Sequence, residues 1–179
     1  MKAALRKEVK RLKQELTPAG RLTFSLHICQ NIAQHPRWEA AQTVLAFYPL
    51  PDEPDLRPLL EQFHQEKRLL LPVVQGDRMV VRQYKGESSL CEGAFHILEP
   101  QGPDLPLPSL QVDLVLVPGV AFDAAGHRLG RGKGYYDYFF AAHPHIATAY
   151  KLGIAFPFQI LDEIPTEPHD ILMDEVLKG

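Results

Sequence analysis

The sequence predicts an α/β protein: a single compact domain with a largely parallel sheet flanked by helices, preceded by an N-terminal helical hairpin. Two observations predict this class. Short apolar runs typical of buried strands alternate with stretches of helical spacing, and the strongest run, residues 113–117, has apolar residues on both faces, as in a covered parallel strand. The 179 residues suffice for one sizeable core, so we expect one domain over residues 1–179.

The composition argues against several classes of function. Nineteen Lys and Arg stand against 22 Asp and Glu, so the chain has no general attraction for nucleic acid, and any anion site must be local. Cys29 and Cys91 have neither disulfide-scaffold nor zinc spacing, and the basic N-terminus lacks the apolar core of a signal peptide. No run approaches the roughly 18 apolar residues of a membrane span. We expect a cytoplasmic monomer with no nucleic-acid or membrane partner.

Two helices are predicted at the N-terminus. The first has an apolar stripe at spacings of four, three and four residues, which consists of Leu5, Val9, Leu12 and Leu16. Thr17 followed by Pro18 is the usual start of a second helix, whose stripe consists of Leu22, Leu26, Cys29 and Ala33. Pro36 should end it, because the residue before a proline avoids the α conformation.

The remaining elements alternate between strand and helix. Runs of β-branched, aromatic and other apolar residues predict strands over residues 43–48, 69–74, 113–117, 149–155 and, more briefly, 175–177. Residues 79–84 should form a further strand, joined to its predecessor by a hairpin-like turn. A helix is expected between residues 56 and 63, and four prolines keep residues 99–111 in a loop.

The stretch that carries the most chemistry follows the strongest predicted strand and reads VPGVAFDAAGHRLGRGKGYYDY, residues 117–138. Its glycines let backbone amides approach an anion closely, and three cations interleave with them: Gly126, Gly130, Gly132 and Gly134, with Arg128, Arg131 and Lys133. A helix should begin at Tyr135 and add positive potential toward a bound phosphate. The stretch therefore predicts a phosphate-binding loop. It matches neither the Walker A nor the Rossmann pattern, and a glycine-rich turn with solvated cations is the alternative.

Charged residues near this loop are candidates for the same ligand. Asp137 could hold Mg²⁺ beside the phosphates, or serve only as a first-turn helix acid. Asp123, Asp170 and Asp174 are further candidates for Mg²⁺, and the alternative for each is a helix cap or turn residue. Asp52 and Glu53 follow the first predicted strand and could contact a polar ligand or form a solvated turn. Lys2 and Arg6 lie one helical turn apart, so both could face one anion or belong to a solvated helix face.

The residues from Asp113 to Asp137, DLVLVPGVAFDAAGHRLGRGKGYYD, resemble the signature of the 5-formyltetrahydrofolate cyclo-ligase (5,10-methenyltetrahydrofolate synthetase) family. Further pieces follow in the family's order: KAALRKEVK, AFYPLPDEPDL, GAFHILEP and HDILMDEVL. The resemblance spans essentially the whole chain and implies a compact α/β domain. It implies a ligase of one-carbon metabolism that uses ATP and Mg²⁺ to convert 5-formyltetrahydrofolate, with or without a polyglutamate tail, into 5,10-methenyltetrahydrofolate, ADP and phosphate. ATP activates the formyl oxygen, and N10 closes the ring.

The resemblance also implies where the nucleotide binds. Lys2 and Arg6 resemble ATP contacts of the family, and its nucleotide loop corresponds to Arg128, Leu129, Gly130, Arg131, Gly132, Lys133, Gly134, Tyr135 and Tyr136. Arg131 and Lys133 are the expected catalytic residues, because a transferred phosphoryl group needs positive charge around it.

Folate and metal contacts are implied in the same way. Tyr48, Glu53 and Tyr135 resemble the family's folate contacts, with the two aromatic rings suited to a pterin. Asp137 and Asp174 resemble its magnesium-associated acids.

Two other functions stay open on the sequence. A small-molecule kinase on a related α/β scaffold would leave the phosphate on its product. A non-catalytic module would bind nucleotide or RNA through the basic loop, although the slightly acidic net charge argues against RNA.

Overall fold

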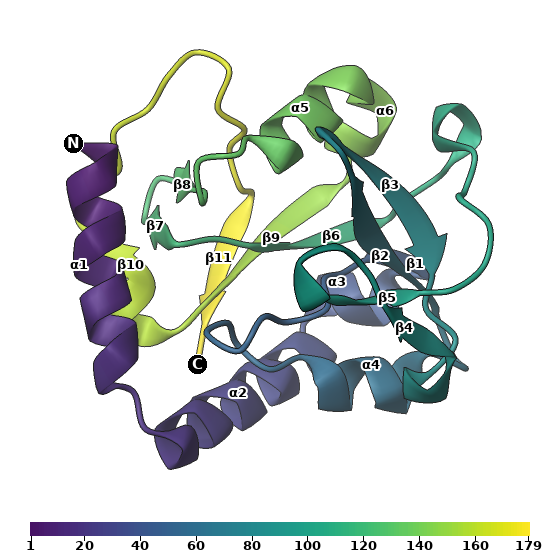
Figure 1. Ribbon diagram of the computed structural model, residues 1–179, viewed down its shortest axis with the longest axis horizontal. Coiled ribbons are helices and arrows are strands. Elements are labelled where there is room, and N and C mark those ends of the chain that lie inside the picture. The colour runs from purple at the N-terminus through teal and green to yellow at the C-terminus, as the bar shows by residue number, and fades with distance from the viewer.

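A six-stranded sheet forms the centre of the molecule, and the computed structural model describes residues 1–179 except for the side chain of Phe95. The strands lie in the order β11–β9–β6–β1–β2–β3 (Figure 1). Their bounds are β1 Thr43–Leu45, β2 Arg68–Gln75, β3 Arg78–Gln83, β6 Leu114–Pro118, β9 Tyr150–Ala155 and β11 Glu175–Lys178. All neighbours pair in parallel except β2 and β3, which form an antiparallel hairpin. The predicted largely parallel sheet is confirmed.

Helices cover both faces of the sheet, as predicted. One face carries α2 (Pro18–Ala33), α3 (Pro36–Ala40) and α4 (Arg57–Phe63), and the other carries α5 (Tyr135–Ala142) and α6 (Pro144–Ala147) (Figure 1). Successive residues of a strand point to opposite faces. Val44 therefore packs with α2 to α4 while Leu45 packs with α5, and each such buried side chain contributes about 1.5–3 kcal/mol.

The two N-terminal helices form where their apolar stripes predict them, but they do not lie side by side. The Thr17 hydroxyl accepts a hydrogen bond of 2.9 Å from the Gly20 amide and caps α2. α1 (Lys2–Glu15) meets α2 at a wide angle (Figure 1). Val9 of α1 is buried in a separate small core with Leu129. The expected hairpin is thus opened out, because α1 packs on this small core whereas α2 packs on the main core through Ile28, Cys29 and Ile32. Leu22 and Leu26 of the predicted α2 stripe are exposed, so that part of the stripe was wrong. None of the helices in the described residues has the length and apolar character needed to cross a membrane.

Several short elements were not predicted. A three-stranded sheet lies against α1 and consists of β7 (Ala121–Asp123), β8 (Arg128–Leu129) and β10 (Ile160–Leu161). A small hairpin joins β4 (Leu90–Glu92) to β5 (Leu98–Pro100), and single 3₁₀ turns occur at Glu87–Ser89, Ala94–His96, Leu107–Ser109 and Pro157–Gln159. These elements contain two or three residues each, too few for a periodicity to show. For the same reason the end of β1 at Leu45, three residues before the predicted one, could not be foreseen.

Candidate active site

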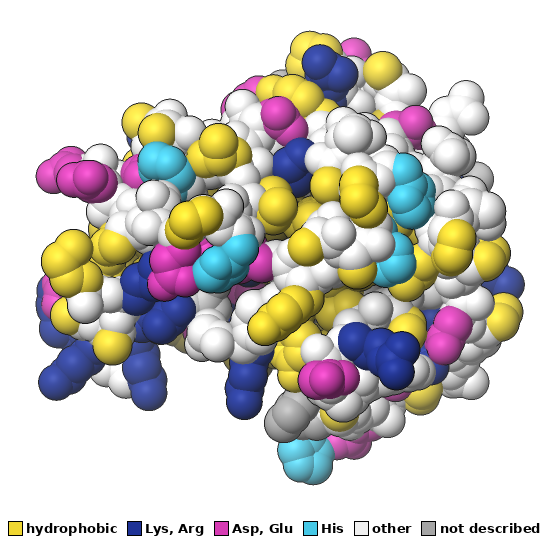
Figure 2. Space-filling view, turned by 90° about the horizontal axis from the view of Figure 1, so that it is seen from above, with side chains coloured by type: hydrophobic (Ala, Val, Ile, Leu, Met, Phe, Trp, Pro, Cys, Tyr) yellow, Lys and Arg dark blue, Asp and Glu magenta, His cyan; other side chains and the backbone are white. Residues whose placement is uncertain are grey.

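A cavity of about 500 Å³ opens at the carboxyl ends of β1 and β6. The segments that follow these strands contribute Tyr48 and Gly119 to its wall, and α1 contributes Lys2 and Arg6. Figure 2 shows Lys and Arg side chains gathered on the side formed by α1. Ligands of open α/β sheets commonly bind at this edge, since the connecting loops meet there.

The glycine-rich loop forms one wall of the cavity. Gly132 and Gly134 adopt positive φ angles of 103° and 70°, a region that favours glycine, and Gly134 stands at the N-terminus of α5. Nε of Arg6 donates a hydrogen bond of 2.8 Å to the Gly130 carbonyl and so fastens α1 to the loop. The Leu129 side chain is buried, so only the backbone of this residue is available for the predicted nucleotide contact. Lys133 is exposed at the cavity wall.

Arg128 is the inner cation of the loop. Its Nε donates to the Pro118 carbonyl at 2.7 Å, and its guanidinium carbon lies 4.9 Å from the centre of the Tyr136 ring. Burial lowers the pKa of Arg128 and raises the pKa of Tyr136. The Tyr135 hydroxyl donates to the Gly76 carbonyl at 3.3 Å, which ties the loop to the β2–β3 turn. The predicted nucleotide residues thus share one wall of the cavity.

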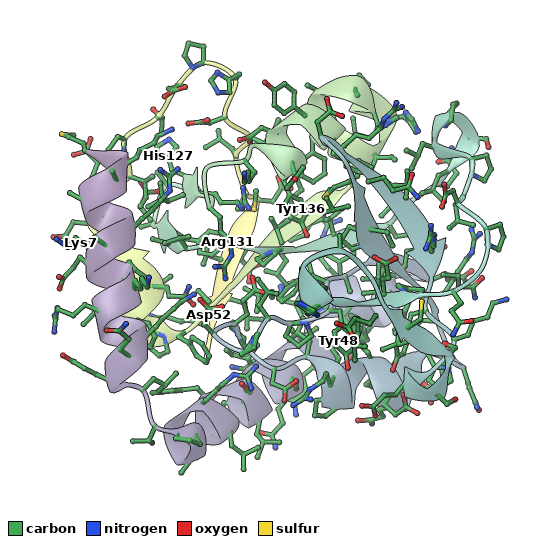
Figure 3. All side chains as sticks on the ribbon, viewed as in Figure 1. Lys7, Tyr48, Asp52, His127, Arg131 and Tyr136 are labelled. Carbon is green, nitrogen blue, oxygen red and sulfur yellow. The ribbon has the colours of Figure 1, made fainter. Side chains whose placement is uncertain are left out.

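Arg131 reaches across to the turn that follows β1 (Figure 3). Its Nη2 lies 2.8 Å from Oδ1 of Asp52 and 3.6 Å from Oε2 of Glu53. Glu53 is 6% exposed, its Oε1 accepts the Leu50 amide at 2.8 Å, and burial raises its pKa. Tyr48 is partly buried on the same side, and burial raises the pKa of its hydroxyl. The predicted folate and phosphate residues are therefore neighbours.

The loop between β10 and β11 lines the side of the cavity that lies next to the N-terminus of α1. Nζ of Lys2 pairs with Asp170 at 3.2 Å and with Glu167 at 3.6 Å. Asp137 lines the cavity, and its Oδ1 accepts the Ile171 amide at 3.3 Å. Glu167, His169 and Asp170 also line the cavity and bring their ligand atoms within 4.8 Å of one another.

Three of the candidate acids lie outside the cavity lining, namely Asp52, Asp123 and Asp174. Oδ2 of Asp174 accepts the Lys151 amide at 2.8 Å and lies 3.6 Å from Lys151 Nζ. Asp123 is 3% exposed and accepts hydrogen bonds from the amides of Ala125, His127 and Ile164. Asp123 thus takes the turn role that was its alternative. Asp174 is not brought beside Asp137, because its side chain points to the strand β9 instead.

An apolar wall was missed by the reasoning from the sequence. The β2–β3 hairpin contributes Val73 and Met79, and the β4–β5 hairpin contributes Ile97 and Leu98. The strand residues look like ordinary core residues, and a run of apolar letters does not show which face opens onto a cavity. The GAFHILEP segment was a signal that could have indicated Ile97 and Leu98.

Fold and cavity together define a class of protein: a small α/β enzyme with a cationic, glycine-rich loop facing an apolar wall across one cavity. The comparisons with known proteins specify it further. The model of the 5-formyltetrahydrofolate cyclo-ligase family matches residues 1–179. The chain belongs to this family, and its function is the conversion of 5-formyltetrahydrofolate to 5,10-methenyltetrahydrofolate.

Individual relatives agree with the family match. The chain is 36% identical to the 5-formyltetrahydrofolate cyclo-ligase of Mycolicibacterium smegmatis over 77% of this chain and 74% of that protein. It is 32% identical to the Mus musculus enzyme, over 98% and 92% of the two chains. The NMR structure of Aquifex aeolicus 5,10-methenyltetrahydrofolate synthetase superposes with a TM-score of 0.84 at 34% identity, covering 98% of this chain and 88% of that one. The predicted family and fold are confirmed.

Proposed function

We propose that the cavity performs this conversion with ATP as the activating substrate, bound along the glycine-rich loop. ATP use is implied by the family, and the arrangement of cations supports it. Arg128, Arg131 and Lys133 line one wall together with Lys2 and Arg6 of α1. A triphosphate carries up to four negative charges, and cations in a partly enclosed cavity bind it more strongly than they would in bulk water.

The folate is proposed to lie between the loop and the apolar wall. Tyr48 and Tyr135 offer aromatic faces, and Glu53 offers a buried carboxylate that could accept hydrogen bonds from the amino groups of a pterin. Ile97 and Leu98 supply apolar contact for the rest of the ring system. The substrate's formyl group would then face Arg131, which stands where the two halves of the cavity meet.

The reaction then proceeds in two displacements. The formyl oxygen attacks the γ-phosphorus of ATP, and ADP leaves with the electrons of the broken P–O bond. The lone pair of N10 attacks the formyl carbon, N10 loses its proton, and phosphate leaves with the electrons of the C–O bond. Arg131 and Lys133 neutralise the phosphoryl oxygens during the first step, while the cavity walls hold N10 near the formyl carbon for the second.

Magnesium is proposed to bind on the side of Asp137. The carboxylates of Asp137 and Asp170 both line the cavity, and carboxylate oxygens are the donors that Mg²⁺ prefers. Bound there, the ion would supply positive charge to the phosphates of ATP. Asp174, which the family resemblance implies, would have to leave Lys151 to take part.

The chain is proposed to work as a monomer, because residues of one chain supply both the cationic loop and the apolar wall. The observation that carries the whole proposal is the approach of Arg131, on the cationic loop, to Glu53, the proposed folate contact, in a member of the family.

Absorbance of the conjugated methenyl product tests the proposal directly. Purified protein is mixed with 5-formyltetrahydrofolate and MgCl₂, with and without ATP. We expect product that depends on ATP, with one ADP and one phosphate released for each ring closed. ADP release without methenyl product or free phosphate would instead indicate a kinase, and binding without turnover would indicate a non-catalytic module.

A further inference from the structure

Arg131 is held by a carboxylate that does not itself line the cavity. Its Nη2 lies 2.8 Å from Oδ1 of Asp52, whereas Glu53, which does line the cavity, is 3.6 Å away. Glu53 also uses one oxygen to accept the Leu50 amide. Asp52 is therefore the nearer partner of the Arg131 guanidinium (Figure 3), and it is not one of the residues that line the cavity.

Asp52 is anchored in turn by α1. Its Oδ2 lies 3.4 Å from Nζ of Lys13, whose side chain is only 8% exposed. Burial opposes ionisation of Asp52, but Arg131 and Lys13 outweigh burial and hold its pKa below the ordinary value. Asp52 is thus a carboxylate at neutral pH with two cationic partners, one on the helix α1 and one on the glycine-rich loop.

We infer that Asp52, anchored by Lys13, is a positioning residue that holds the Arg131 guanidinium at the meeting point of the nucleotide and folate halves of the cavity. The inference rests on the proposed function. An arginine has four flexible side-chain torsions, and a free Arg131 would present its charge to the phosphoryl group in only some of its rotamers. Asp52 touches neither substrate in this arrangement and acts through Arg131 alone.

The competing explanation is that the ion pairs of Asp52 only stabilise the fold. The expected sizes of the effects on stability and on rate distinguish this explanation from positioning of Arg131. The half-exposed pair with Arg131 contributes little to folding, about 2–4 °C in melting temperature, and the largely buried Lys13 ammonium that Asp52→Ala leaves unpaired adds to this loss. Misplacing a catalytic cation by an ångström can cost far more in rate, up to about 100-fold. Kinetics and stability should therefore respond very differently to the same substitution.

The test is a double-mutant cycle in the methenyl absorbance assay. We expect Asp52→Ala to lower kcat about tenfold, with a near-normal KM for the folate. Asp52→Asn, which keeps an oxygen acceptor for Arg131, should lose less. The Asp52→Ala, Arg131→Ala double variant should be no slower than Arg131→Ala, because Asp52 has nothing left to position.

A matched control comes from another ion pair of the same chain. Asp104 pairs with Arg82 at 2.8 Å, its side chain is 45% exposed against 44% for Asp52, and neither residue of the pair lines the cavity. Asp104→Asn should leave kcat unchanged. A wild-type kcat in Asp52→Ala would overturn the inference. So would a double variant that is slower than Arg131→Ala by the same factor by which Asp52→Ala is slower than the wild type. Failure of the wild-type protein to form product would instead overturn the proposed function, before any variant is compared.

Discussion

Lys133 is an exposed cation of the glycine-rich loop, and among the described residues no carboxylate lies within ion-pair distance of it. Its charge is therefore available to a phosphate. We expect Lys133→Ala to lower kcat about 100- to 1,000-fold, the range for loss of one group that stabilises transition-state charge. Steady-state kinetics with the absorbance assay measure this. The control is Lys85→Ala, because Lys85 is an exposed lysine outside the cavity, and this variant should behave like the wild type. Unchanged kinetics in Lys133→Ala would remove Lys133 from the mechanism.

Glu53 is a proposed folate contact, and its burial has a cost in stability. Glu53→Gln keeps the shape of the side chain but removes its charge, so we expect the KM for 5-formyltetrahydrofolate to rise about tenfold or more, as for loss of a charged hydrogen bond. The effect on kcat should be smaller. An unchanged KM would count against the folate contact.

The same substitution should stabilise the fold at neutral pH. Burial raises the pKa of Glu53, so the folded state binds this proton more tightly than the unfolded chain does, and ionised Glu53 destabilises the fold. The penalty is absent below the unfolded pKa of about 4.3 and grows as the pH rises through the folded value. The melting temperature of Glu53→Gln should therefore be higher than that of the wild type at pH 7, and the two melting temperatures should converge near pH 4. A lower melting temperature at pH 7 would show that the contact with Arg131 outweighs burial.

The β7–β8 turn illustrates how a short element is specified by packing. Gly126 has a φ of 89°, its carbonyl accepts the Met173 amide at 2.8 Å, and a Cβ at this position would lie 2.4 Å from the Met173 carbonyl oxygen. Gly76 in the β2–β3 turn also has a positive φ, 65°, but has open space where a Cβ would lie. The two glycines differ in their surroundings far more than in their backbone conformation.

Alanine substitutions at these two positions should separate strain from clash. Gly76→Ala should cost about 1–2 kcal/mol, the cost of a left-handed conformation. Gly126→Ala should cost more, because the backbone of the loop before β11 must also move. Urea unfolding curves of the two variants make the comparison, and equal losses would contradict the tight approach of Met173. The sequence placed a glycine-rich loop here, but it could not distinguish a crowded glycine from a free one.

At the scale of the whole molecule, the cavity is closed by contacts between distant parts of the chain. Arg6 bonds to Gly130, Lys2 pairs with Asp170, and Arg131 pairs with Asp52. A ligand that joins these segments should stabilise the entire fold. At a concentration 100 times its Kd, ATP with Mg²⁺ should add about 2.7 kcal/mol, which raises the melting temperature by about 5–10 °C.

Thermal shifts can also identify the magnesium ligands. Asp137→Asn should abolish the part of the shift that depends on MgCl₂ while leaving the part due to ATP alone. Asp174→Asn should keep both parts, because that side chain is engaged with Lys151 outside the cavity. The opposite result for Asp174 would show that the β11 end of the chain rearranges when the nucleotide binds.

The sequence by itself determined the fold class, most of the sheet strands, the start of α2 and α5, and the cationic glycine-rich loop. These features depend on periodicity, capping residues and glycine spacing within windows of about ten residues. The family signature added the reaction. The tertiary structure alone decided that α1 opens away from α2, that Val73, Met79, Ile97 and Leu98 form an apolar wall, that Asp52 holds Arg131, and that Asp174 faces Lys151 instead of Asp137. The physical reason is that partners such as Asp52 and Arg131 are separated by 79 residues, and only packing of the whole chain determines which of many possible partners meet.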